Sequence, residues 1–269
     1  MTEAARRPAP IGARAAGRVS LSPDIDPADW PAAGMALFLD VDGTLIDFAP
    51  HPDEVRVPPD LTGALAHAEQ ALGGALALLS GRAIADLDRL TAPLRLRAIG
   101  LHGAECRPDP HGPASSSAAP LPASLVAGMR ALLASFPGAW LEDKGASASA
   151  HYRAAPSYGP ELGAALARFV DRAARDGGGP RLDLMAGELI YEIKPAGFDK
   201  GSALSHFMTL PPFAGRLPVF VTDHSIDQAG LTAAAALGGR GLSVGRRLPG
   251  AAACFRDPAA VRAWLRDLS

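Results

Sequence analysis

The sequence contains little cysteine and no long apolar run. Cys106 and Cys254 are its only cysteines, and they lie far apart in no metal-ligand spacing. We therefore expect free, unreactive thiols, and neither a disulfide framework nor a zinc site. No stretch approaches the about 18 consecutive apolar residues of a membrane span. The prediction is a cytoplasmic protein without a membrane partner.

A net charge of either sign is almost absent. The formal charge of −2 gives no electrostatic reason to expect nucleic acid as a partner. The charge does not exclude small neutral or anionic ligands. The chain has 269 residues, of which 48% are apolar, and this suits one large domain or two small ones with a substantial core. We expect a folded monomer.

The first 30 residues differ in composition from the rest. They are rich in Ala, Arg and Pro but lack the apolar stretch of a secretory signal. We interpret residues 1–30 as a flexible leader, so the folded part is expected to begin at residue 31.

Strands and helices alternate after the leader. Met35 to Leu39 form a continuous apolar run that ends at Asp40, which is typical of a strand buried on both faces. A helix over 60–72, a second apolar strand in "GALALLSGR" and a helix opened by "SGRAIADLDRL" follow. This order predicts an α/β fold, a Rossmann-like core with a parallel sheet and helices on both faces.

A smaller unit interrupts this alternation. The polar, Pro- and Ser-rich stretch "CRPDPHGPASSSAAPLPAS" is typical of an exposed connection. Helices are predicted over 125–136 and 161–175, and strands within "AWLEDKGASASAHYR" and "RLDLMAGELIYEIKP". The core resumes with a helix after Asp199, the strands "PVFVTD" and "GLSVG", and a final helix with Asp257 as N-cap. The predicted parts are a first core part over 31–106, an inserted α/β cap domain over 107–192 and a second core part over 193–269.

The strongest chemical signal is "LFLDVDGTL". Asp40 and Asp42 lie two residues apart where an apolar strand gives way to a Gly turn, at the edge where open α/β sheets bind ligands. Hydrolysis of a phosphate monoester needs a nucleophile and a proton donor for the leaving alkoxide. Asp40 can be the nucleophile, forming an aspartyl phosphate, and Asp42 the acid/base. A turn that uses Asp and Gly for geometry alone is the competing interpretation.

These residues resemble the first motif, DxDGT, of the haloacid dehalogenase-like phosphohydrolases. The resemblance implies that Ser80 of "LLSGR" binds the transferring phosphoryl group. It also implies that Lys200 of "FDKG" holds the aspartate and phosphate charges together. The same resemblance implies an Mg²⁺ site made by Asp40, the backbone carbonyl of Asp42 and Asp223 of "VFVTD", since Mg²⁺ prefers oxygen donors.

Within that superfamily the sequence resembles the trehalose-6-phosphate phosphatases. The matching stretches are "LFLDVDGTL", "LSGR", "GLHGAE", "WLEDKGASASAHYR", "YEIKPAGFDKG" and "GGRGLSVG". Several of them fall in the inserted unit, which selects the substrate in this superfamily. A disaccharide head needs buried polar side chains that make directional hydrogen bonds. The implied substrate contacts are Arg82 near the phosphate, Glu105, Lys144, His151, Arg153, Glu192 and Lys194, with Glu105, Lys144 and Glu192 as leading candidates.

Some residues of these stretches have simpler interpretations. His151 and Arg153 alternate with Tyr152, so one side of that strand can equally face water. Trp140 and Tyr152 are interpreted as part of the cap core, because isolated aromatic residues on strands usually pack. His102 is interpreted as a turn residue rather than a ligand contact.

The fourth motif departs from the family pattern. The family reads roughly GDDxTDED, whereas this chain has "TDHSIDQA". Asp223 remains as the expected direct metal ligand, with His224 and Asp227 behind it. Replacing a carboxylate at 224 by imidazole predicts weaker Mg²⁺ binding, and changes behind the ligands cost about ten- to a hundredfold in affinity or activity. A competing hypothesis makes His224 a nitrogen ligand that favours manganese or cobalt.

The sequence leaves three functions open. The leading hypothesis is an Mg²⁺-dependent phosphatase that converts trehalose 6-phosphate to trehalose and phosphate, which the resemblance implies as the last step of trehalose biosynthesis. A phosphatase for another sugar phosphate is the nearest alternative. The third is a catalytically weak homologue that binds a sugar phosphate and regulates, supported only by the altered fourth motif. Against it, a chain released from catalysis has no chemical reason to keep Asp40, Asp42, Ser80, Lys200 and Asp223 together.

Overall fold

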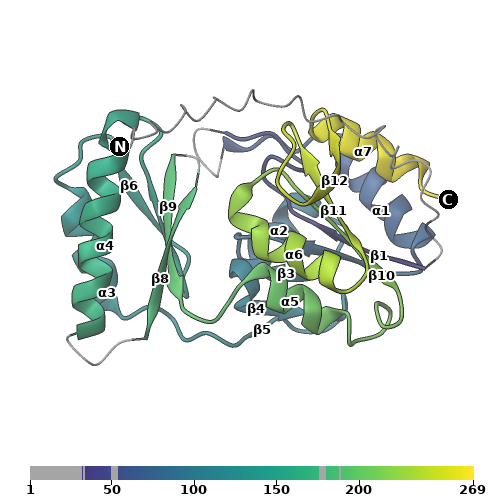
Figure 1. Cartoon of the computed structure of the whole chain (residues 1–269), viewed down its shortest axis with the longest axis horizontal. Coiled ribbons are helices and arrows are strands. Elements are labelled where there is room, and N and C mark those ends of the chain that lie inside the picture. The colour runs from purple at the N-terminus through teal and green to yellow at the C-terminus, as the bar shows by residue number, and fades with distance from the viewer. Residues whose placement is uncertain (1–31, 33, 50–53, 176–179, 188) are drawn as a thin grey trace, which may run out of the picture.

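The structure is a computed structural model that describes residues 32, 34–49, 54–175, 180–187 and 189–269. The predicted leader, residues 1–30, lies outside these ranges. Figure 1 shows two α/β units side by side, each built on its own sheet. Among the helices described, none is long and apolar enough to cross a membrane.

The larger unit, the core, is built on an eight-stranded sheet with the order β12-β11-β10-β1-β2-β3-β4-β5. Its strands are β1 (Met35–Leu39), β2 (Leu76–Leu79), β3 (Arg97–Gly100), β4 (Glu105–Arg107), β5 (Ser115–Ser116), β10 (Leu217–Thr222), β11 (Arg240–Val244) and β12 (Ala251–Phe255). The strands from β12 to β3 are parallel, which confirms the predicted parallel sheet. β4 and β5 form an antiparallel edge. Sequence reasoning missed β3, β4, β5 and β12, because the first three are short and β12 is mostly alanine.

Helices cover this sheet (Figure 1). They are α1 (Leu61–Ala71), α2 (Ile84–Thr91), α5 (Lys200–Phe207), α6 (Gln228–Ala236) and α7 (Pro258–Asp267). α1 packs beside α7, and α5 packs beside α6. The predicted N-cap of the last helix is confirmed, since the Asp257 carboxylate accepts a hydrogen bond from the backbone N–H of Ala260 at 2.8 Å.

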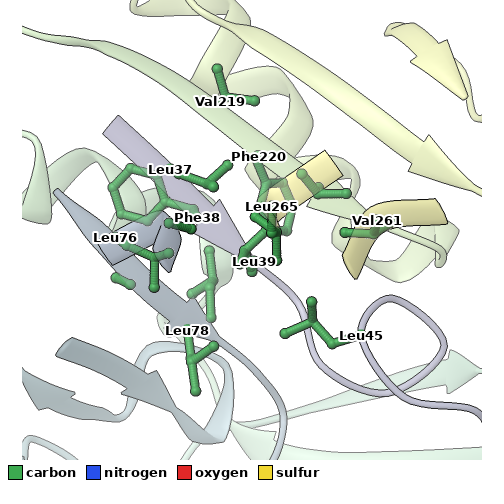
Figure 2. Close-up of a cluster of buried hydrophobic side chains, with 14 of the residues drawn as sticks. Leu37, Phe38, Leu39, Leu45, Leu76, Leu78, Val219, Phe220, Val261 and Leu265 are labelled. Atoms are coloured by element: carbon green, nitrogen blue, oxygen red, sulfur yellow. The ribbon is translucent and has the colours of Figure 1, made fainter. Parts of the chain in front are cut away.

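The hydrophobic core of this unit forms around β1. All five side chains of β1 are buried, as a strand covered on both faces requires. Figure 2 shows Leu37, Phe38 and Leu39 of β1 among Leu76, Leu78, Phe220 and the α7 side chains Val261 and Leu265. Burying each such side chain stabilises the fold by about 1.5–3 kcal/mol. This packing fixes the strand end that carries Asp40.

The smaller unit, the cap domain, has a four-stranded antiparallel sheet with two helices on one face (Figure 1). In sheet order its strands are β6 (Trp140–Asp143), β7 (Ala148–His151), β9 (Ile190–Pro195) and β8 (Leu182–Gly187), and its helices are α3 (Ala123–Leu133) and α4 (Gly159–Arg175). The predicted helices and strand pairs are confirmed. Met129, Leu162 and Ile193 are among the buried side chains between sheet and helices. The other face of the sheet looks toward the core. The boundaries 107 and 192 stay predictions, and β9 itself ends at Pro195.

Candidate active site

The carboxyl ends of three neighbouring parallel strands bring the predicted catalytic side chains together. Asp40 and Asp42 follow β1, Ser80 follows β2, and Asp223 follows β10, in the sheet order β10-β1-β2. Lys200 is the first residue of α5. All five line one cavity between the core and the cap sheet. The same cavity holds further predicted substrate and metal residues, namely Arg82, Lys144, His151, Arg153, Glu192, His224 and Asp227.

Lys200 joins two carboxylates at the floor of this cavity. Its Nζ donates to Asp40 Oδ1 at 2.9 Å and to Asp227 Oδ2 at 2.7 Å. Thr222 Oγ1 also donates to Asp227 Oδ2, at 2.6 Å. Burial opposes the ammonium charge, but the carboxylates of Asp227 and Asp40 outweigh it and raise the pKa of Lys200. Lys200 is therefore a permanent cation beside Asp40.

Negative charge is crowded at the same edge of the sheet. Burial raises the pKa of Asp40 well above its ordinary value, and the carboxylates of Asp227 and Asp223 add to this against the opposing effect of Lys200. Burial and the Asp227 carboxylate raise the pKa of Asp223 to about 6. Three carboxylates thus share one ammonium, and a further cation would relieve their repulsion.

The donor set fits a hard divalent cation. Asp40, the backbone carbonyl of Asp42 and Asp223 offer oxygen donors and leave positions for water and phosphate, as Mg²⁺ requires. Among the described residues, no three His, Cys, Asp or Glu side chains converge on one point. Gly43 keeps the approach open, since a Cβ there would lie 2.2 Å from Asp223 Oδ2.

Arg82 and Asp42 form a two-pronged ion pair. The Arg82 Nε and Nη2 atoms donate to the two carboxylate oxygens of Asp42, each at 2.6 Å. Burial lowers the pKa of Arg82, but its contacts with Asp42 outweigh burial and leave the pKa above its ordinary value. Such planar pairing suits carboxylate and phosphate equally. The predicted acid/base and the predicted phosphate contact are therefore direct partners.

Polar side chains of the cap sheet form the opposite wall of the cavity. Lys144 Nζ donates to Glu192 Oε1 at 3.2 Å and to the core carbonyl of Gly81 at 3.3 Å. Burial opposes the Glu192 charge, but His102 and Lys144 hold the pKa of Glu192 well below its ordinary value. His151 Nε2 lies 2.9 Å from a Glu142 carboxylate oxygen. This wall is charged, largely paired and close to the core.

Two predicted substrate contacts lie outside the cavity. Glu105 Oε2 accepts a hydrogen bond from the backbone N–H of Ile84 at 2.7 Å, so it caps the first turn of α2. Lys194 Nζ lies 3.4 Å from Asp183 Oδ2 and donates to the backbone carbonyl of Phe198. Both side chains hold the backbone of their own surroundings instead of facing Asp40.

Sequence reasoning missed His102, Glu142 and Phe48, which all line the cavity. Glu142 lies in β6 and Lys144 directly follows the end of that strand, and this spacing of two was a signal that both share one face. Phe48 is 47% exposed, and the Arg153 guanidinium lies 5.6 Å from its ring centroid. No sequence pattern predicts that contact, because it joins the core to the cap domain.

Three predictions about neighbouring aromatic and turn residues have mixed outcomes. Tyr152 packs in the cap core as expected. Trp140 is half-buried and stacks on His151, with ring centroids 4.2 Å apart. His102 has the left-handed backbone of a turn residue, with φ of 54°, but its side chain also reaches Glu192 at 2.5 Å.

In the altered fourth motif, His224 acts as an acceptor within its own turn. Its Nδ1 accepts a hydrogen bond from the backbone N–H of Ile226 at 3.1 Å, and its own backbone N–H donates to Thr222 Oγ1 at 3.2 Å. The Nδ1 lone pair therefore cannot bind a metal in this geometry. Asp227 pairs with Lys200 at 2.7 Å, and its carboxylate also raises the pKa of Asp223, so it lies next to both the ammonium and the predicted metal ligand.

Comparisons with known proteins find one family. The family model of the trehalose-phosphatases matches residues 38–233. A probable trehalose-phosphate phosphatase of Sinorhizobium fredii is 40% identical over 242 residues, which cover 90% of this chain and 86% of the relative. The trehalose-6-phosphate phosphatase of Escherichia coli is 38% identical over 216 residues, covering 80% and 79%. The C-terminal domain of the C. albicans trehalose-6-phosphate phosphatase shares the fold, with a TM-score of 0.74 at 18% identity over 87% of this chain and 92% of that domain.

Proposed function

The chain belongs to the trehalose-phosphatase family, and on this premise we propose that it hydrolyses trehalose 6-phosphate to trehalose and inorganic phosphate. The reaction passes through an aspartyl phosphate on Asp40. The observation that carries the proposal is the cavity that unites Asp40, Asp42 and Lys200 with the polar wall of the cap sheet. A phosphatase for another sugar phosphate would employ the same groups, and membership of the trehalose-phosphatase family favours trehalose 6-phosphate as the substrate.

In the first half-reaction, a carboxylate oxygen of Asp40 attacks phosphorus and the bond from phosphorus to the sugar oxygen breaks. Protonated Asp42 gives its proton to that oxygen, which leaves as a hydroxyl group of trehalose. In the second half-reaction, water attacks phosphorus and gives a proton to Asp42, and the bond to Asp40 breaks. The Lys200 ammonium lies 2.9 Å from Asp40 Oδ1 and lowers the pKa of Asp40 against the effect of burial, which favours the ionised form needed for the attack.

Ser80, Arg82 and a divalent cation handle the phosphate. Ser80 lies at the end of β2 in the same cavity, and Arg82 offers its guanidinium fork. A phosphate competes with Asp42 for that fork, so substrate binding frees the Asp42 carboxyl to exchange protons. Asp40, Asp223 and the carbonyl of Asp42 would hold Mg²⁺, which when bound would supply positive charge that offsets the phosphate.

The cap wall recognises the sugar. Lys144, His151, Arg153 and Glu192 line the cavity opposite Asp40, and their charged groups can donate to or accept from sugar hydroxyls. Sites that pair each hydroxyl with a buried polar group discriminate strongly against analogues that lack it. A phosphate ester without those hydroxyls should therefore be a poor substrate.

The test is phosphate release from trehalose 6-phosphate and from a panel of other sugar phosphates with Mg²⁺. The Asp40→Asn protein is the blank, since it keeps the size of the side chain and removes the nucleophile. Selective release from trehalose 6-phosphate that vanishes in the blank supports the proposal. Equal or faster release from another sugar phosphate would instead favour the alternative substrate.

A weak, regulatory homologue would be recognised by binding without phosphate release. It would bind trehalose 6-phosphate, detected by calorimetry, while releasing no phosphate above the Asp40→Asn blank with Mg²⁺, Mn²⁺ or Co²⁺. Retention of the Lys200 contacts with Asp40 and Asp227 argues for turnover. A binder has no use for a cation fixed against the nucleophile.

A further inference from the structure

His102 connects the phosphate side of the cavity to its sugar side. It lies in the short helix Leu101–Gly103 that follows β3, is 5% exposed, and its backbone N–H donates to the Ser80 carbonyl at 3.1 Å. Its ring lies against Gly81, where a Cβ would come within 2.5 Å of Nε2. The imidazole is thus held by the loop that carries Ser80 and Arg82.

The other end of His102 contacts the cap domain. Its Nε2 lies 2.5 Å from Glu192 Oε2, and Lys144 takes the other Glu192 oxygen at 3.2 Å. His102 belongs to the core, whereas Glu192 of β9 and Lys144, which follows β6, belong to the cap domain. With the hydrogen bond from Lys144 to the Gly81 carbonyl at 3.3 Å, these contacts join the two units directly beneath the sugar side of the cavity.

The backbone of His102 and the burial of the Glu192 carboxylate both indicate that the imidazole has a role beyond the turn. A residue other than glycine with φ of 54° occupies a backbone region that costs about 1 kcal/mol or more. A buried carboxylate also needs partners for both oxygens, since an unpaired buried charge is strongly destabilising. Glycine or asparagine would satisfy the turn at a smaller cost, but neither reaches Glu192 as imidazole does.

Resting on the proposed function, we propose that His102 is the positioning residue that fixes the Glu192 carboxylate for sugar binding when the cap domain lies on the core. His102 Nε2 and Lys144 Nζ hold one carboxylate oxygen each, so the carboxylate plane is set before a sugar arrives. Each oxygen keeps a second lone pair, which is directed by that plane. Because one holder comes from the core, Glu192 is aligned only in the closed arrangement, so sugar recognition depends on closure.

Two substitutions distinguish positioning of Glu192 from a role of His102 in the backbone turn alone. His102→Gln places its side-chain amide nitrogen near the position of Nε2 and keeps a donor for Glu192. His102→Asn tolerates the left-handed backbone better but carries its amide nitrogen near the position of Nδ1, short of Glu192. A positioning role predicts that the Gln variant is the more active, whereas a role in the turn alone predicts that the Asn variant is.

The measurement is kcat and KM for trehalose 6-phosphate and for p-nitrophenyl phosphate, which lacks sugar hydroxyls. His102→Asn should lower kcat/KM for the sugar phosphate about tenfold to a hundredfold, mainly through KM, with a much smaller loss on p-nitrophenyl phosphate. The matched control is His111→Asn, an exposed position remote from the cavity, which should change neither. Similar losses on both substrates, or an Asn variant more active than the Gln variant, would overturn the inference.

A double-mutant cycle with Glu192→Gln completes the test. If His102 acts through Glu192, adding His102→Asn to the Glu192→Gln protein should lower kcat/KM by less than about threefold. Fully additive losses would show that His102 acts independently of Glu192 and would overturn the inference. Failure of the proposed function looks different, since the wild-type protein would then release phosphate as fast or faster from another sugar phosphate, or would release none from any substrate.

Discussion

Arg82 holds both carboxylate oxygens of Asp42 at 2.6 Å, so the candidate acid/base is engaged by the candidate phosphate ligand. This pairing has a chemical consequence. Asp42 cannot protonate a leaving group while both oxygens accept from a guanidinium, whereas an arriving phosphate offers Arg82 an alternative anion. Substrate binding and activation of Asp42 are therefore linked through one side chain.

The first prediction tests this link with Arg82→Lys. An ammonium is a point charge that cannot make the paired contacts, so we expect a higher KM together with a kcat lower by about tenfold to a hundredfold. Steady-state phosphate release measures both constants. Arg89→Lys is the matched control, because Arg89 is a largely exposed member of α2 that pairs with Asp86. An Arg82→Lys protein with wild-type constants would contradict the link.

The second prediction concerns Lys200. Its removal in Lys200→Met leaves the carboxylates of Asp40 and Asp227 buried without a counter-ion, which costs about 3–5 kcal/mol. The loss of stability should be larger at pH 7.5 than at pH 5.5. Burial already raises the pKa of Asp40, and a carboxyl with a raised folded pKa contributes stability at low pH that is lost as pH rises. Urea unfolding at the two pH values measures the difference.

A double variant controls that experiment. Lys200→Met combined with Asp227→Asn removes one of the two stranded charges, so part of the stability should return. Activity should stay absent, since Asp40 still lacks its cation. Equal stability of the single and double variants at pH 7.5 would mean that the carboxylates do not repel one another.

The order of most elements could be predicted because the central core strands β1, β2 and β10 are almost entirely buried and the helices each have an apolar face. The same physics placed Asp40, Ser80 and Asp223 at one sheet edge. It could not place Glu105, because that depends on β4, a three-residue strand without a sequence pattern. It also could not find the His102 contact with Glu192, which spans 90 positions and depends on how the cap domain meets the core.

The third prediction concerns Mg²⁺ and pH. Burial raises the pKa of Asp223 to about 6, so a cation must displace a proton from Asp223 below that pH. The apparent affinity for Mg²⁺ should be weaker at pH 5.5 than at pH 7.5 by about fourfold or more. Thermal unfolding with increasing MgCl₂ at each pH reports the affinity. The melting temperature of Asp223→Asn should not rise with MgCl₂ at either pH. A wild-type affinity for Mg²⁺ that is the same at both pH values would contradict the prediction.

The fourth prediction concerns acid stability and Glu192. Its pKa is held below the ordinary value by His102 and Lys144 against burial. A carboxyl with a lowered folded pKa contributes stability above its unfolded pKa and loses it as pH falls, so the wild-type protein should lose about 2 kcal/mol below about pH 4.5. Glu192→Gln lacks the titrating group, so its free energy of unfolding, measured with urea, should change less between pH 3 and pH 6 than that of the wild type. The same pH dependence in both proteins would contradict the prediction.

The fifth prediction concerns His224→Asp, which restores the acid of the family pattern. The structure shows His224 Nδ1 accepting the Ile226 N–H at 3.1 Å, a contact that an aspartate oxygen can replace, so the turn should keep its shape. The added negative charge should tighten Mg²⁺ binding by about tenfold. The order of activation by Mg²⁺, Mn²⁺ and Co²⁺ should stay as in the wild type, because His224 is a turn acceptor and not a ligand. A wild-type preference for Mn²⁺ or Co²⁺ that His224→Asp converts to Mg²⁺ would instead make the imidazole a ligand, bound through Nε2.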